Sequence, residues 1–133
     1  MIVNLLRFAF KQEATAQERA EVLAVLRGLT ELEPVSFSSV GPDIGDDPRF
    51  THAYCVALAD FDALRRYVND PAHLAADSVI IPRLARLSAT RFADEGSPEL
   101  AEAVNALHRE KAAAHPEWAR LLGTVPELDL AAG

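Results

Sequence analysis

The chain has 133 residues and a net charge of −7, which leaves room for one domain and disfavours binding to the phosphate backbone of nucleic acids. Half of the residues are hydrophobic and a quarter are charged, a composition typical of a folded globular domain rather than a disordered chain. No apolar stretch approaches the roughly 18 residues that a membrane span needs, so we expect no membrane partner.

Residues 2–10 are predicted to form the first strand. The segment lacks the basic region and small-residue cleavage site of a secretory signal, so we expect a cytoplasmic protein. Alternation places two sets of side chains on opposite faces: Asn4, Leu6, Phe8 and Phe10 on one, and Val3, Leu5, Arg7 and Ala9 on the other.

A capping box, in which Thr15 is followed three residues later by Glu18, predicts the start of a helix. Gly28 lies near its predicted end. A second strand is predicted over 35–40, and a polar loop over 41–48. The helix has one apolar stripe, formed by Val22, Leu23, Leu26 and Leu29.

The third strand is predicted over about residues 51–59. Cys55, on one face of it, is the only cysteine of the chain, which excludes an intramolecular disulfide. Its apolar surroundings predict a buried, unreactive thiol. The opposite face carries His52, Tyr54, Val56 and Leu58.

Two helices are predicted between the third strand and the fourth. Asp60 or Asp62 caps the first of them. Asp70 caps the second, and Pro71 occupies its first helical position, where a missing N–H costs nothing.

Pro82 ends or kinks the second of these helices, and residues 87–92 form the fourth predicted strand. The order strand, helix, strand, strand, helix, strand is the ferredoxin-like arrangement, an α+β fold with an antiparallel sheet.

Helices of the same domain can cover one face of this sheet. The other face is too apolar for water, so we expect a second copy of the chain to cover it in a homodimer.

Beyond the fourth strand the sequence changes character. Residues 97–99, Ser-Pro-Glu, are a strong helix start. Pro116 interrupts this helix, and 117–122 form a further short one. We therefore divide the chain into an α+β domain, 1–94, and a helical extension, 95–133, packed over the domain or its partner. The extension carries an apolar stripe of Leu100, Val104 and Leu107.

Four short stretches occur together in this order along the chain. They are Asn4-Leu5-Leu6-Arg7-Phe8-Ala9-Phe10, Val35-Ser36-Phe37 leading to Val40-Gly41-Pro42, Thr51-His52-Ala53-Tyr54, and Tyr67-Val68-Asn69-Asp70-Pro71-Ala72-His73. With the strand and helix order, they resemble the stress-responsive A/B-barrel (Dabb) domains over about residues 1–94. The resemblance implies a ferredoxin-like protomer whose sheet packs on that of a second copy, forming a dimeric α/β barrel.

The resemblance also implies a site. Some relatives are cofactor-free lyases or polyketide cyclases that use tyrosine and histidine in a pocket between sheet and helices, and Tyr67 and His73 fall on that pair. A neutral imidazole there can remove a proton next to a carbonyl while the phenol stabilises the oxyanion. Other relatives have no assigned activity, and the alternative is that His73 only closes a helix junction, with Tyr67 packed on it.

Two positions depart from the family pattern. Relatives usually have histidine where this chain has Asn4, and the acidic partner of the cyclase histidine falls on Arg91, whose guanidinium cannot accept a hydrogen bond. The first and fourth strands are neighbours in this fold. Asn4 and Arg91 therefore either line one end of the pocket, where Arg91 attracts a carboxylate or enolate, or Arg91 points into solvent.

Three further residues are candidates for substrate contact. Phe8 and Tyr54 fit an aromatic pocket wall, although such a strand face is usually core. His52 is a pocket-rim residue or a structural one. His108 and His115 lack ligands at metal-binding spacing, and no glycine-rich phosphate motif occurs, so we expect neither a metal nor a cofactor.

The sequence therefore favours a homodimeric barrel protein that binds a small, largely apolar carbonyl compound. Cofactor-free lyase- or cyclase-type catalysis by His73 and Tyr67 is the chemistry that fits. A non-catalytic stress-response or assembly protein on the same barrel is the alternative. A cofactor-free monooxygenase would fit the fold, but no particular residue of this chain indicates one.

Overall fold

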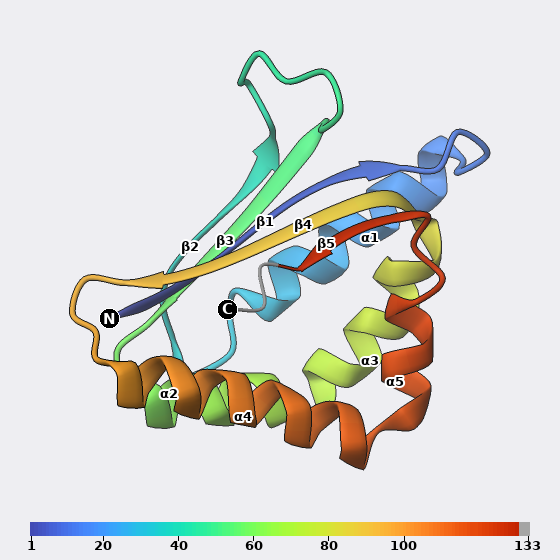
Figure 1. The fold of residues 1–133 in the computed structure, drawn as a ribbon. Helices are drawn as coiled ribbons and strands as arrows, with labels where there is room; N and C mark the ends of the chain where they lie inside the picture. Colours follow the sequence, from blue (N-terminus) through green and yellow to red (C-terminus); the bar gives the residue numbers. More distant parts are fainter. Residues whose placement is uncertain (131–133) are drawn as a thin grey trace.

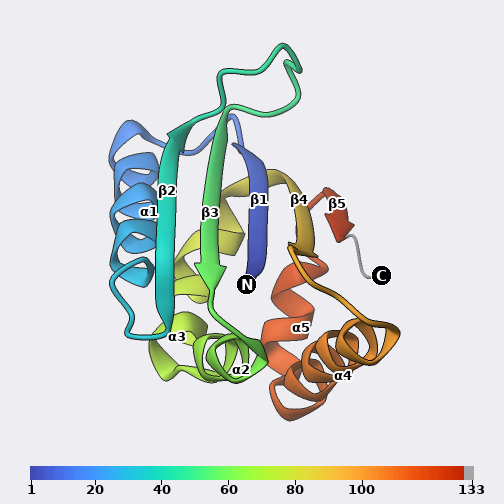
Figure 2. The same ribbon diagram turned by 90° about the vertical axis from the view of Figure 1, so that its left-hand side faces the viewer.

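The computed structural model describes residues 1–130 and contains a five-stranded sheet with all the helices packed on one face (Figure 1). The strands are β1 (Ile2–Phe10), β2 (Val35–Pro42), β3 (His52–Leu58), β4 (Leu84–Ala93) and β5 (Glu127–Leu130). Figure 2 shows them fanned in the order β2-β3-β1-β4-β5. The first four pair antiparallel, as in a ferredoxin-like fold, which confirms the predicted arrangement. The fifth strand, which was not predicted, pairs parallel to β4, so the complete sheet is mixed.

Side chains cap the helices as the sequence predicts. Thr15 and Glu18 exchange both hydrogen bonds of a capping box. Asp60, Asp70 and Ser97 each accept a backbone N–H of the first turn. The helices are α1 (Ala16–Leu29), α2 (Phe61–Asn69), α3 (Pro71–Ile80), α4 (Pro98–Ala114) and α5 (Pro116–Leu122), with a 3-10 turn, η1 (Ile81–Arg83), between α3 and β4.

Two strands extend beyond their predicted bounds. Gly41 and Pro42, predicted as loop, continue β2, because β2 is an edge strand on which proline is tolerated. β4 begins at Leu84 rather than at residue 87, since η1 ends the preceding helix and Leu84 pairs with Phe10.

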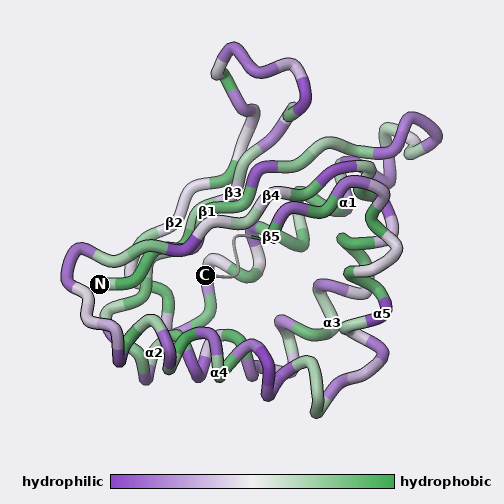
Figure 3. The backbone as a smooth tube through the Cα atoms, in the orientation of Figure 1, coloured by the Kyte–Doolittle hydropathy of each residue, from purple (hydrophilic) through white to green (hydrophobic). Residues whose placement is uncertain are grey.

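The helix-facing side of the sheet holds the core. Leu6 pairs with Tyr54 on β3 and with Ala89 on β4, so one face receives every second residue of all three central strands. Hydrophobic segments of strands and helices face one another across this interior, whereas the projecting loop between β2 and β3 is largely hydrophilic (Figure 3). The largest fully buried side chains are Phe8, Val22, Tyr54, Val56, Leu58, Leu64, Tyr67 and Leu84.

The opposite face of the sheet has no helix on it. Phe37 and Phe92 are 61% and 54% exposed there. Cys55 also lies on this face and is only partly buried, so the prediction of a buried thiol is wrong for a single copy of the chain. Burial nevertheless raises the pKa of this thiol, which disfavours the reactive thiolate.

The C-terminal elements pack on the domain of the same chain. α4 lies against α2, α5 lies against α3 and η1, and β5 extends the sheet beside β4 (Figure 1). Leu107 and Val125 of this segment are buried in the common core. Among the helices of residues 1–130, none combines the length and the apolar character needed to cross a membrane.

Candidate functional site

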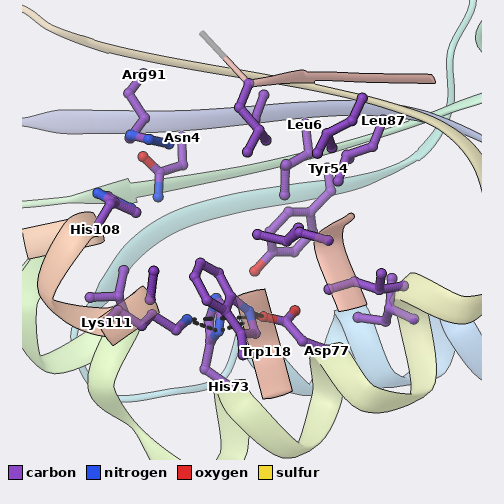
Figure 4. Close-up of a pocket in the computed structure, with 18 of the residues that line it drawn as sticks. Asn4, Leu6, Tyr54, His73, Asp77, Leu87, Arg91, His108, Lys111 and Trp118 are labelled. Carbon is purple, nitrogen blue, oxygen red and sulfur yellow. Dashed lines mark hydrogen bonds and ion pairs between the residues drawn. The ribbon is translucent and has the colours of Figure 1, made fainter. Parts of the chain in front are cut away.

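A cavity of about 650 Å³ lies between the sheet and the helices (Figure 4). This volume is in the range that suits a small organic molecule. Apolar side chains from β1, β3, β4 and the helices form most of its wall. Residues of α4, α5 and β5 also contribute, so the C-terminal segment completes the enclosure rather than lying apart from it.

A polar network occupies the helix side of the cavity. Asp77 follows His73 by four residues on α3, which places both side chains on one helical face. His73 Nδ1 lies 3.3 Å from Asp77 Oδ2 and 3.1 Å from Lys111 Nζ. The Trp118 indole Nε1 donates to the same Asp77 oxygen at 2.7 Å. Figure 4 shows these four side chains converging at the cavity.

Burial sets the charges of this network. Burial lowers the pKa of Lys111 to about 8, against the opposing effect of the Asp77 carboxylate. Burial alone would raise the pKa of Asp77, but the hydrogen bond from His73 and the charge of Lys111 outweigh it, and the pKa is lowered. Asp77 is therefore ionised at neutral pH, whereas Lys111 is close to losing its proton.

Two phenols face the same cavity. The hydroxyl oxygens of Tyr54 and Tyr67 lie 2.6 Å apart, so one donates to the other and a proton remains available for a ligand. Burial raises the pKa of Tyr54 to about 12 and that of Tyr67 still further, so both are neutral donors rather than bases. The Tyr67 ring also contacts the His73 ring edge-to-face, with 4.8 Å between centroids.

A second polar group projects from the sheet and from α4. Asn4 and Arg91 are cross-strand partners, and both line the cavity, so Arg91 does not simply point into solvent. Asn4 Oδ1 is buried without a hydrogen-bond partner, and none of residues 1–130 forms an ion pair with Arg91. His108 donates from Nδ1 to the Val104 carbonyl at 2.8 Å, and burial lowers its pKa to about 4, which keeps the ring neutral.

Of the three remaining residues predicted to contact substrate, two line the cavity and one does not. Phe8 and Tyr54 line the cavity. His52 does not: its ring lies 5.6 Å from that of Phe8 and 5.2 Å from that of Phe10, and its Nδ1 bonds Thr51. His52 is therefore placed as a packing residue rather than as a ligand contact.

Four cavity residues were not predicted as site residues from the sequence: Asp77, His108, Lys111 and Trp118. Asp77 supplies the carboxylate that the resemblance located at Arg91, and its i,i+4 spacing from His73 was a readable signal. Lys111 and Trp118 lie in the extension, where no local pattern indicates which residues meet α3. His108 was considered only as a metal ligand.

The family model described as the stress responsive A/B barrel domain matches residues 2–95. A dimeric ferredoxin-like protein of unknown function from Thermobifida fusca is 26% identical, with a TM-score of 0.62 over 69% of this chain and 89% of that one. No curated protein matches the chain.

Two further solved structures share the fold at lower identity. A Dabb family protein from Mesorhizobium loti is 18% identical, with a TM-score of 0.63 over 71% of this chain and 97% of its own. A hydroxynitrile lyase from Passiflora edulis is 16% identical, with a TM-score of 0.64 over 73% of this chain and 96% of its own. At these identities the likeness is one of fold alone.

Proposed function

This chain belongs to the stress responsive A/B barrel domain family, and from that premise we propose that its cavity binds a small, largely apolar carbonyl compound and performs lyase- or cyclase-type acid–base chemistry without a cofactor. The observation that carries the proposal is the contact of a partly buried histidine with a carboxylate, beside two neutral phenols, in an otherwise apolar cavity. Apolar cavities with a few convergent polar groups are the usual sites of small-molecule chemistry.

The chemistry follows from the positions of these groups. The imidazole of His73 takes a proton from the carbon beside the carbonyl, and the C–H electron pair forms the enolate, whose charge moves to oxygen. A phenol of the Tyr54–Tyr67 pair donates a hydrogen bond to that oxygen. The Asp77 carboxylate stabilises the imidazolium until its proton passes to the product or to a leaving group.

The polar groups on the sheet side of the cavity favour a substrate with an acidic end. Arg91 offers a cation without an ion-pair partner among the described residues, and Asn4 offers a buried acceptor that is not satisfied. A carboxylate or enolate of the ligand would pair with Arg91, and a neighbouring hydroxyl would donate a hydrogen bond to Asn4 Oδ1. This fits a compound with an apolar body and one acidic or enolic terminus.

We further propose that two copies of the chain pack through the helix-free face of the sheet. Exposed Phe37 and Phe92 make this face apolar. Solved relatives from Thermobifida fusca and Jannaschia are described as dimeric ferredoxin-like proteins. The cavity lies on the other side of the sheet, so this association leaves it available to ligand.

The test of the catalytic proposal is deuterium incorporation next to the carbonyl. Alkyl and aryl methyl ketones, with and without a carboxylate, are incubated with the protein in D2O and followed by NMR. We expect exchange above the buffer rate, lowered about 100-fold or more by His73→Ala and also lowered by Tyr67→Phe. If no ketone exchanges above the buffer rate, or if folded variants exchange as fast as the wild type, the non-catalytic alternative is favoured.

A further inference from the structure

Lys111 is a buried cation whose nearest carboxylate lies beyond hydrogen-bond distance. It is 3% exposed and is the one charged side chain classed as buried within residues 1–130. Lysine is rarely buried this completely unless it is paired. Its Nζ lies 3.9 Å from Asp77 Oδ2, beyond hydrogen-bond distance, and that oxygen already accepts from Trp118. Its closest polar neighbour is His73 Nδ1 at 3.1 Å, which carries no negative charge and is not a counter-ion.

Loss of hydration favours the uncharged amine in this part of the cavity, where Ala112 and Ala119 contribute apolar wall. The face of the Trp118 ring, 4.4 Å from Nζ, and the Asp77 carboxylate favour the ammonium, but burial outweighs them. Burial lowers the pKa of Lys111 to about 8, so a sizeable fraction of the amine is neutral near physiological pH. Desolvated lysines of this kind are nucleophiles toward carbonyl carbon.

We propose that Lys111 is a covalent attachment site of the cavity, where its amine forms an imine with an aldehyde or an unhindered ketone. The inference rests on the proposed function, since it requires that the cavity admits carbonyl compounds. It adds the nucleophile, the class of carbonyl that can react, and a role for the C-terminal extension, because Lys111 lies on α4.

The step balances without an oxidant, a reductant or a cofactor. Nζ forms a bond to the carbonyl carbon, the π pair of the carbonyl moves to oxygen, and a proton passes from nitrogen to that oxygen. Loss of the hydroxyl with a second proton releases one water and leaves a C=N bond. His73, 3.1 Å from Nζ, is placed to carry these protons, and hydrolysis reverses the sequence.

An imine at Lys111 would also assist the acid–base step at His73. A protonated imine withdraws electrons from the adjacent carbon more strongly than a neutral carbonyl does, so the neighbouring C–H becomes more acidic. An imine on Nζ, 3.1 Å from His73 Nδ1, would hold the acidic C–H near the imidazole. Asp77, ionised beside both groups, stabilises the positive charge on either one.

The experiment traps the imine by reduction. The full-length protein is treated with octanal and sodium cyanoborohydride, and modified peptides are located by mass spectrometry. The chain supplies its own controls, because its amines are Lys111, Lys11 and the N-terminal amine of Met1. Octanol, which cannot form an imine, is titrated in parallel, with the fluorescence of Trp118, the single tryptophan, as the binding signal.

We expect Lys111 to be alkylated at least ten times faster than Lys11 in the wild-type protein. Lys11→Arg should keep this labelling, Lys111→Arg should lose it, and excess octanol should suppress it. If octanol binds but octanal is trapped only at Lys11 or Met1, or equally at all amines, the imine inference is overturned and the binding proposal stands. If neither octanol nor the ketone panel binds, both fail. The distribution of alkylated amines in the wild-type protein decides the outcome, so the test does not depend on whether a variant folds.

Discussion

At the scale of single residues, the contact between His73 and Asp77 is the main departure from what the resemblance implies. The resemblance located the acidic partner of this histidine at Arg91, a residue of the opposite charge that cannot accept a hydrogen bond. Asp77 restores a carboxylate from the next turn of the same helix. Arg91 instead lies beside Asn4, its cross-strand partner. Helical spacing, rather than alignment to relatives, identifies the partner.

The hydrogen bond between Tyr54 and Tyr67 predicts non-additive stability. Tyr54→Phe or Tyr67→Phe alone leaves one buried hydroxyl unsatisfied and should lower the free energy of unfolding by about 1–3 kcal/mol. The double variant leaves no unsatisfied hydroxyl. Its free energy of unfolding should therefore fall by less than the sum of the decreases in the two single variants. Urea unfolding of the four proteins measures this coupling. Strict additivity would mean that the two hydroxyls do not bond.

Burial of Lys111 predicts a rise in stability with pH. The pKa is about 8 in the folded protein and 10.5 is the ordinary value, so between these pH values the unfolded chain binds more protons and alkali favours folding. Relative to Lys111→Met, the wild type should gain about 1–3 kcal/mol from pH 8 to pH 10.5. The other titratable groups of the cavity are present in both proteins, so their contribution to the pH dependence largely cancels in the difference between the two free energies of unfolding. Urea unfolding at several pH values checks this, and a constant difference would contradict it.

Residue patterns predict local features well and distant contacts poorly. The Thr15–Glu18 capping box and the Asp70 cap depend on residues a few positions apart, and both are present. Lys111 meets His73 across 38 residues. That contact depends on how α4 docks, which no spacing along the chain encodes.

At the scale of elements, the C-terminal segment contributes most that was not predicted. β5 is four residues long, with Glu127 and Asp129 alternating with Leu128 and Leu130, too short a pattern to distinguish from a turn. Its pairing with β4 places the two leucines at the cavity. The helices of the extension could be predicted from their caps, but their docking on the same chain's cavity follows from tertiary packing.

Trp118 predicts how firmly α5 is held. Its indole N–H bonds Asp77 and so ties α5 to α3. Trp118→Phe keeps an aromatic ring and removes that donor, so α5 should open more easily by about 1 kcal/mol, or roughly fivefold. Amide hydrogen exchange measures this, with α1 as the internal reference. Unchanged exchange in α5 would show that its docking does not depend on this bond.

At the scale of the whole molecule, the open face of the sheet predicts an interface between copies. A twofold dimer buries each Phe37 once per protomer, so Phe37→Glu removes two apolar contacts, about 3–6 kcal/mol in total. The dimer dissociation constant should rise at least 100-fold. Ile44→Glu, at a 95% exposed loop position, is the matched control and should change nothing. Sedimentation equilibrium decides this, and a monomeric wild type at micromolar concentration would contradict it.

The proposed reaction centre is built around His73, and a pair of histidine variants tests whether the reaction needs this residue. His73 and His52 both lie at the ends of regular elements, but of the two only His73 lines the cavity. The measurement is the rate of deuterium incorporation into a bound ketone, by NMR, for His73→Gln and His52→Gln. We expect a loss of about 100-fold or more for His73→Gln and less than a twofold change for His52→Gln. Equal rates in the two folded variants would contradict it.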